Sequence, residues 1–148
     1  EIILPCDLAV AEEKARFALP EVRVGLYAAA GGVQRLTRQI GRKAAMELIL
    51  TGRHFDAAEA LALGIINERT ADGGALEAAR ALATRLLENS PSAIRASKEA
   101  LNKLEELESL ETAMAANGRI FGRLMRTKDF REGLTAFAEK RKPEWSGT

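Results

Sequence analysis

Two glutamates, Glu1 and Glu21, are the residues of this chain whose types and neighbours best suit chemistry. Glu1 precedes the apolar run Ile2–Leu4, and Glu21 follows Leu19-Pro20. A carboxyl group beside apolar residues suits general acid or base chemistry, because loss of water disfavours its charged form and lets it exchange protons near neutral pH. The alternative for each is an ordinary surface carboxylate, since glutamate side chains are mostly exposed.

A glycine pair, Gly31-Gly32, follows this segment and precedes Val33-Gln34-Arg35-Leu36. Glycines before an apolar-periodic run predict a turn that leads into a helix N-terminus. The N–H groups of such a terminus can hold an anion or a polarised oxygen. The pair lacks the spacing of a P-loop or of a dinucleotide-binding fingerprint.

Short strands and helices are predicted to alternate around these residues. Strands are expected at 8–11, 16–19 and 65–68, where short apolar runs occur. Helices are expected at 33–40 and 42–50, closed by Gly41 and Gly52, and from the D-x-x-E signal of Asp56 and Glu59 to Gly64. From Gly32 onward the helical signals dominate.

The rest of the chain reads as helical. Apolar residues recur at helical spacing in 75–88, and Ser90-Pro91 starts a helix predicted to bury Ile94, Leu101 and Leu104. The acidic residues Glu105, Glu106, Glu108 and Glu111 are interpreted as a solvated face. Asp129 with Glu132 is expected to start a last helix, in which Gly133 indicates close packing. The loop at 71–74 divides two predicted domains, 1–72 and 73–148.

Composition excludes several classes of partner. The 148 residues contain 22 basic and 21 acidic side chains, so nucleic-acid binding has little support. No apolar stretch approaches the length of a membrane span. Cys6 is the only cysteine and is expected to be a small buried hydrophobe. His54 is the only histidine and no Cys/His cluster exists, so no metal site is predicted. With a single cysteine no internal disulfide is possible, which fits a cytoplasmic or organelle-matrix setting, and a cytoplasmic one is expected.

Several separated motifs resemble the crotonase, or enoyl-CoA hydratase, superfamily in the right order. Residues 1–36 resemble its E-x-x-L-x-C-D-L…P-E-x-x-x-G-L…A-G-G-x-Q-R-L pattern. Residues 44–52 resemble A-x-E-L-x-L-T-G, and residues 57–67 resemble A-x-E-A-x-x-x-G-L-V-N. Residues 132–141 resemble E-G-x-x-A-F-x-E-K-R. The resemblance covers the whole chain but about the C-terminal half of a family member.

The resemblance implies a fold and a reaction. The fold is α/β: the second half of a crotonase-like (ClpP/crotonase) spiral core, followed by an all-helical C-terminal oligomerisation and coenzyme A-covering region. The reaction is hydration of 2-enoyl-CoA thioesters, with Glu1 as the base that accepts a proton from water and Glu21 as the acid that protonates C2. The presence of both carboxylates favours hydratase over isomerase, since isomerases of this superfamily commonly keep one acid–base residue near these positions. The alternatives are another crotonase activity, such as isomerase or hydrolase, or an inactive fragment acting only in assembly.

The resemblance also implies substrate contacts and partners. Gly31 and Gly32 match the turn beside the reacting water, while Ala28-Ala29-Ala30 departs from the P-G-A of many hydratases. Phe121, Phe137 and Lys140 fall where C-terminal helices bind coenzyme A; the alternatives are a core position for Phe137 and a solvated charge for Lys140. A homotrimer or hexamer is expected, with no cofactor, because coenzyme A belongs to the substrate. The oxyanion-hole donors belong to the missing N-terminal half, so the 148-residue chain alone is expected to be inactive.

Overall fold

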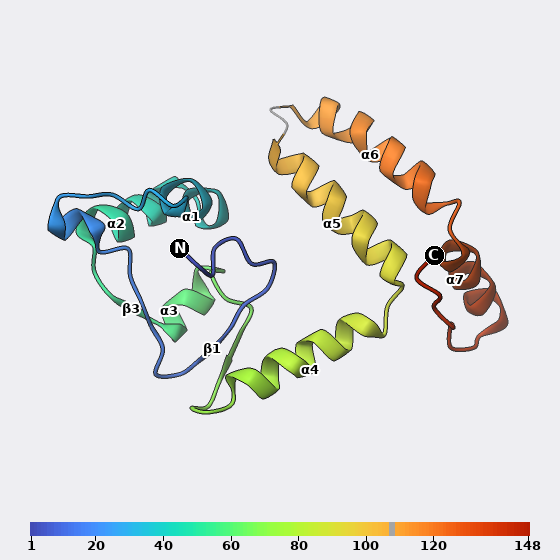
Figure 1. Cartoon of the computed structure of the whole chain (residues 1–148), viewed down its shortest axis with the longest axis horizontal. Helices are drawn as coiled ribbons and strands as arrows, with labels where there is room; N and C mark the ends of the chain where they lie inside the picture. The colour runs from blue at the N-terminus through green and yellow to red at the C-terminus, as the bar shows by residue number, and fades with distance from the viewer. Residues whose placement is uncertain (107–108) are drawn as a thin grey trace. The chain divides into compact units, whose positions relative to one another are not determined.

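Short strands alternate with helices in the first half of the chain, and helices alone follow. The computed structural model describes residues 1–106 and 109–148 (Figure 1). These form two compact units, Glu1–Leu82 and Ala83–Thr148. The division between them falls within the sequence of helix α4 (Ala75–Leu87), whereas the predicted division at residue 72 lies in the loop before it. The division into a catalytic-core part and an oligomerisation part stays a prediction.

Two small sheets organise the first unit. Strand β1 (Val10–Glu12) pairs in parallel with β4 (Glu68–Thr70). Strand β2 (Arg16–Phe17) pairs antiparallel with β3 (Phe55–Asp56), and the rings of Phe17 and Phe55 stack with their centroids 5.5 Å apart. The pairings bring the segment that leads to Glu21 against the segment that follows Gly52.

The strand predicted at 65–68 is displaced toward the C-terminus. Only Glu68 of that range belongs to β4. The amides of Ile65 and Ile66 donate to the carbonyl of Ala60, which keeps these two buried residues in the turn after the helix. Asn67 then bonds Ala9 twice: its N–H donates to the Ala9 carbonyl, and its side-chain oxygen accepts the Ala9 N–H. Pairing by backbone alone therefore begins one residue later.

Three helices of the first unit begin and end close to their predicted bounds. They are α1 (Gly32–Ile40), α2 (Arg42–Thr51) and α3 (Ala57–Ala62). Asp56 caps α3 by accepting the Glu59 N–H at 2.9 Å, as the D-x-x-E signal predicts. Between β2 and α1 lies a single 3-10 turn, η1 (Glu21–Val24). The core these elements share includes Leu4, Leu19, Ala28, Leu36, Ala45, Leu48, Phe55, Ala57, Ala60 and Ile66.

Helices α5 (Pro91–Glu106) and α6 (Leu110–Leu124) lie side by side in the second unit, followed by α7 (Lys128–Glu139) (Figure 1). Arg123 of α6 bonds both carboxylate oxygens of Glu99 on α5, at 2.5 and 2.6 Å. Ser90 caps α5, since its hydroxyl accepts the Ala93 N–H at 3.1 Å. Thr127, rather than Asp129, caps α7 by accepting the Phe130 N–H.

Asp129 instead holds the second unit together as a buried acceptor. One carboxylate oxygen accepts the Ser90 hydroxyl at 2.9 Å and the Ser92 N–H at 3.3 Å. The other accepts the N–H groups of Ser146 and Gly147 at 2.8 and 2.9 Å. Burial by itself raises the pKa of the Asp129 carboxyl, but these donors outweigh it and hold the pKa well below its usual range. The carboxylate thereby ties the chain's last residues to the start of α5.

The burial predicted for the apolar residues of α5 is wrong for Leu101 and holds only in part for Ile94. Leu101 is 63% exposed, although helical spacing predicts that it is buried, and Ile94 is half-buried. For α4 the sequence predicts helical spacing but no burial, and none of its side chains is buried in the described structure. The side chains of Leu104, Glu105, Glu106 and Glu108 lie outside the described residues, while Glu111 is exposed as predicted. Gly133 does pack closely, because a methyl group there would lie 3.4 Å from the Trp145 ring.

Within residues 1–106 and 109–148, no helix combines the length and apolar composition that a membrane span requires.

Candidate active site

Glu1 binds the first turn of α1. Its Oε1 accepts the Gly32 N–H at 2.9 Å, and Gly31, which precedes the helix, has a φ of +98°. The positive φ suits glycine, and the absence of a side chain at Gly32 leaves room for the carboxylate. A methyl group at position 32 would lie 2.8 Å from Glu1 Oε1 and 2.7 Å from the Ala28 Cβ. The N–H of the glycine turn therefore binds a carboxylate, that of Glu1, which is one of the two kinds of group that a helix N-terminus can hold.

Glu1 also lines an apolar cavity of about 360 Å³. The other lining residues come from the N-terminal segment, from β2 and the chain after it, and from α1, β3 and the turn after α3: Ile2, Ile3, Leu4, Arg16, Phe17, Ala18, Leu19, Leu36, Phe55 and Ile65. The lining does not include three of the predicted site residues that the structure describes: Glu21, Gly31 and Gly32. Glu21 follows Leu19, a lining residue, by two positions.

Glu21 is the first residue of η1 and is half-buried. Its backbone carbonyl accepts the Leu26 N–H at 3.0 Å, which closes the turn. Its side-chain Oε2 is buried and has no hydrogen-bond donor among the described residues. Most buried polar atoms in proteins have a partner, so such an oxygen requires an explanation. A carboxyl group that exchanges a proton with a substrate needs one oxygen that no protein donor occupies.

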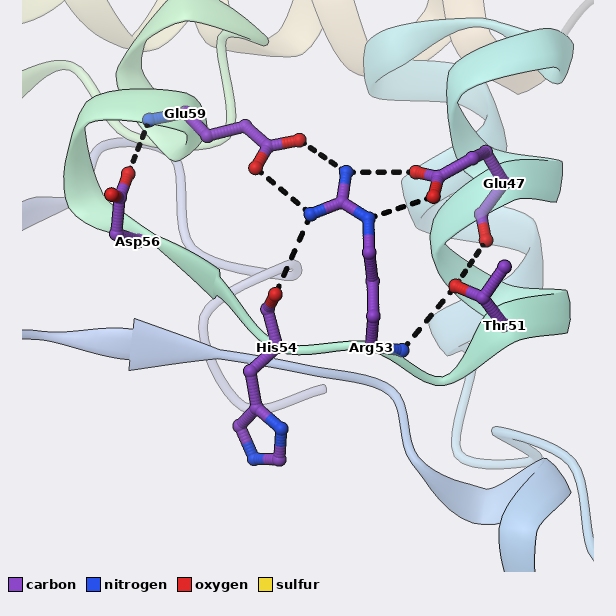
Figure 2. Close-up of polar contacts among 6 residues, drawn as sticks. All are labelled: Glu47, Thr51, Arg53, His54, Asp56 and Glu59. Atoms are coloured by element: carbon purple, nitrogen blue, oxygen red, sulfur yellow. Dashed lines mark hydrogen bonds and ion pairs between the residues drawn. The ribbon is translucent and has the colours of Figure 1, made fainter.

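A guanidinium between two carboxylates joins α2 to α3 (Figure 2). Arg53 Nε and Nη2 donate to the two oxygens of Glu47 at 2.7 and 2.8 Å. Its Nη1 donates to one oxygen of Glu59 at 2.9 Å, and its Nη2 binds the other. The hydrogen bonds to Arg53 lower the pKa of both carboxyls and raise the pKa of Arg53. We refer to Glu47, Arg53 and Glu59 as the Arg53 clamp.

The remaining predicted contacts with coenzyme A lie in the second unit. Phe121 of α6 is half exposed and meets the Phe130 ring edge to face, with centroids 6.2 Å apart. Phe137 of α7 is 87% exposed, so its alternative assignment to the core is wrong in this chain. Lys140 ends α7 in the left-handed conformation with an exposed side chain. Their role in binding coenzyme A stays a prediction.

Cys6 is exposed, contrary to its predicted burial. It closes a surface turn, in which its N–H donates to the Ile3 carbonyl at 3.0 Å. His54 lies in the loop between α2 and β3, and its ring points away from the Arg53 clamp (Figure 2). In the part of the chain that the structure describes, no three His, Cys, Asp or Glu side chains group as metal ligands would.

The Arg53 clamp and the buried Asp129 were not found from the sequence. Glu47 and Glu59 each lie six residues from Arg53, which is neither a helical nor a strand spacing. Asp129 bonds Ser90 across 39 residues. The one available signal was the T-G-R turn at 51–53, which places an arginine directly after a helix end and before the acidic start of the next helix.

The sequence model of the family described as "Enoyl-CoA hydratase/isomerase" matches residues 1–148. The Mycobacterium bovis protein named "Probable enoyl-CoA hydratase echA8" is 42% identical over 146 residues, which are 99% of this chain and 56% of that protein. The "Short-chain-enoyl-CoA hydratase" of Clostridium acetobutylicum is 37% identical, covering 97% of this chain and 55% of that protein.

Solved structures agree with these sequence relatives. The crystal structure of the enoyl-CoA hydratase from Bacillus anthracis superposes with a TM-score of 0.92 at 36% identity, covering 98% of this chain and 56% of that one. The fold is therefore the C-terminal part of the crotonase fold, as predicted, and the chain spans about half the length of the curated relatives it matches. Because the family model matches along the whole sequence that carries Glu1, Glu21 and the glycine turn, the chain belongs to the enoyl-CoA hydratase/isomerase family.

Proposed function

We propose that the full-length protein carrying this chain hydrates 2-enoyl-CoA thioesters to 3-hydroxyacyl-CoA, with Glu1 and Glu21 as its acid–base pair. The observation that carries the proposal is the buried Oε2 of Glu21, which has no donor among the described residues. The second support is the Glu1 carboxylate at the N-terminus of α1, since the N–H end of a helix suits a negative charge.

In the proposed reaction, water adds to the β-carbon of the enoyl thioester. Glu1 accepts one proton of that water as the oxygen bonds to C3, and Glu21 donates a proton to C2. The negative charge that develops on the thioester carbonyl is stabilised by two backbone N–H donors, typically worth about 3–4 kcal/mol each. We assign those donors to the part of the protein outside this chain. The reaction is redox-neutral, so it needs no cofactor besides the coenzyme A of the substrate.

Substrate binding and assembly extend the proposal to the helical unit. We assign Phe121, Phe137 and Lys140 to the coenzyme A moiety, because two of them expose aromatic surface and the third exposes a cation. We assign the exposed apolar side chains of α4–α6 to contacts between subunits of a trimer or a pair of trimers; they include Leu76, Leu87, Leu101, Leu110 and Met114. Obligate interfaces of this kind bury about 2,000 Å² or more. A monomeric mass of the full-length protein would contradict this assignment.

Glu21→Gln in the full-length protein tests the chemistry. The amide keeps the shape of the carboxyl but cannot donate the proton, so we expect kcat to fall by about 10²–10⁴-fold with KM little changed. Glu13→Gln is the matched control, because Glu13 is an exposed carboxylate of the same unit. Loss of the enoyl absorbance of crotonyl-CoA measures the rate. Near-normal turnover of Glu21→Gln, or a preference for 3-enoyl over 2-enoyl substrates, would refute the assignment.

A further inference from the structure

Residues 16–23, which include Glu21, contact residues 52–56 at two places. Arg16 and Phe17 pair with Asp56 and Phe55 in the β2–β3 ladder. Farther along, η1 approaches Gly52 so closely that a methyl group there would lie 3.1 Å from Val22 Cγ2 and 3.3 Å from Arg23 Cγ. Gly52 also has a φ of +57°, which favours glycine. The 52–56 segment therefore forms the support of the chain that leads into and through η1.

Turn η1 has little to fix it in place besides this support. Within the described structure none of its four residues is fully buried, although the Oε2 atom of Glu21 is. Its own hydrogen bonds are short-range: the Arg23 N–H donates to Pro20, and the Leu26 N–H donates to Glu21. A single 3-10 turn has weaker hydrogen-bond geometry than an α-helix. The position of the Glu21 side chain thus follows the position of the 52–56 segment.

The Arg53 clamp fixes that segment to two helices at once. Arg53 binds Glu47 of α2 and Glu59 of α3 through paired hydrogen bonds, and its Nη1 also contacts the His54 carbonyl at 3.4 Å (Figure 2). Thr51 completes the turn, because its hydroxyl donates to the Glu47 carbonyl and accepts the Arg53 N–H. Paired arginine–carboxylate bonds restrict orientation as well as distance.

We propose that the Arg53 clamp is a positioning device for Glu21: it holds the 52–56 segment, which in turn sets the placement of η1 and of the Glu21 carboxyl in the acid–base site. This inference rests on the proposed function. The clamp contributes little to overall stability, because its side chains are 35–48% exposed and exposed ion pairs are weak. Its effect is therefore expected in the rate of the chemical step rather than in the melting temperature.

The test compares Arg53→Ala with Arg123→Ala in the full-length protein. Arg123 is the matched control, because its Nη2 also binds both oxygens of a carboxylate, that of Glu99, but between α6 and α5. We expect Arg53→Ala to lower kcat for crotonyl-CoA by about 10²-fold, the usual effect of an ångström-scale misplacement, with KM unchanged. Arg123→Ala should leave kcat unchanged. Equal kcat values for Arg53→Ala and wild type would overturn the inference.

A double variant separates positioning from a general structural effect. If Arg53 acts through Glu21, Arg53→Ala should cause no further loss once Glu21→Gln has removed the acid. Multiplication of the two losses would overturn the inference. Glu59→Gln keeps the shape of the side chain but removes its charge and one of the two oxygens that accept hydrogen bonds from Arg53. It decides the question if Arg53→Ala does not fold, since it should also lower kcat selectively and become silent in the Glu21→Gln background.

Amide hydrogen exchange gives a readout that does not depend on activity. The amides of Arg23 and Leu26 should exchange faster in Arg53→Ala and keep their wild-type rate in Arg123→Ala. Unchanged exchange at both amides would overturn the inference. If the wild-type protein does not hydrate enoyl-CoA thioesters at all, the proposed function fails, while the exchange comparison still decides whether the clamp holds η1.

Discussion

Gly32→Ala tests the contact between the glycine turn and Glu1. The added methyl would lie 2.7 Å from the Ala28 Cβ and 2.8 Å from Glu1 Oε1. The first distance is about 0.8 Å shorter than the ~3.5 Å at which two carbon atoms pack well. Ala28 is 1% exposed, so it cannot move into solvent. The start of α1 must therefore shift, and the Glu1 carboxylate must leave the Gly32 N–H.

Two magnitudes follow from this geometry. Overpacking of a closed site costs about 1–3 kcal/mol of folding free energy. A displacement of Glu1 by about 1 Å should lower the rate of hydration by about 10²-fold. Activity is therefore expected to fall much more than the loss of stability can explain, because a protein destabilised by this amount is still mostly folded.

The assay measures kcat on crotonyl-CoA and the thermal midpoint of the same full-length preparations. Gly118→Ala is the matched control: Gly118 lies in α6 and a methyl group there would meet no atom within 4 Å. Because alanine favours a helix by about 1 kcal/mol over glycine, this control should be equally or more stable, with unchanged kcat. Wild-type kcat in a folded Gly32→Ala variant would refute the reasoning.

Two further predictions concern the second unit. Asp129→Ala leaves the buried Ser90 hydroxyl and Ser92 N–H without this acceptor, so urea unfolding followed by circular dichroism should show a loss of about 3 kcal/mol or more; a loss below 1 kcal/mol would contradict the buried network. The Arg141 guanidinium and the Glu144 N–H lower the pKa of Glu132 to about 2, and the pKa of Asp129 in the folded protein is also lowered. Both carboxylates therefore stabilise the folded state fully above their unfolded pKa values of about 4. This stabilisation is lost as the pH falls through their pKa values in the folded state. Helix content of the wild type should decline below about pH 4, and Glu132→Gln should flatten that decline.

Local signals in the sequence predicted the elements around the site correctly. Gly41 and Gly52 follow the ends of α1 and α2, and Asp56 caps α3, because each of these effects depends on residues within one helical turn. For the same reason the glycine pair was correctly predicted to form a turn that leads into the N-terminus of a helix. The binding of Glu1 to this turn was not predicted, because the Glu1–Gly32 contact spans 31 residues.

Burial and long-range contacts were harder to predict from the sequence. Leu101 and Cys6 have apolar character, but exposure is set by which segments cover them, and neither periodicity nor composition contains that information. Asp129 was interpreted as a helix-start residue from its spacing to Glu132, and α7 does begin nearby, at Lys128. Its partners at Ser90 and at 146–147 emerge only in three dimensions. The pairing of Glu1 with Glu21 stays a prediction from the family resemblance.

The parallel β1–β4 pair has a consequence for synthesis on the ribosome. The hydrogen bonds between Ala9 and Asn67 join residues 58 positions apart, next to Val10 and Glu68 of the ladder. At about 5–20 residues per second, β1 is made roughly 3–12 s before its partner. Helices form in microseconds or less, so α1–α3 can take shape while the backbone N–H and C=O groups of β1 still lack β4. During that interval the backbone of β1 is not paired with β4, and it is available to chaperones that bind extended apolar segments.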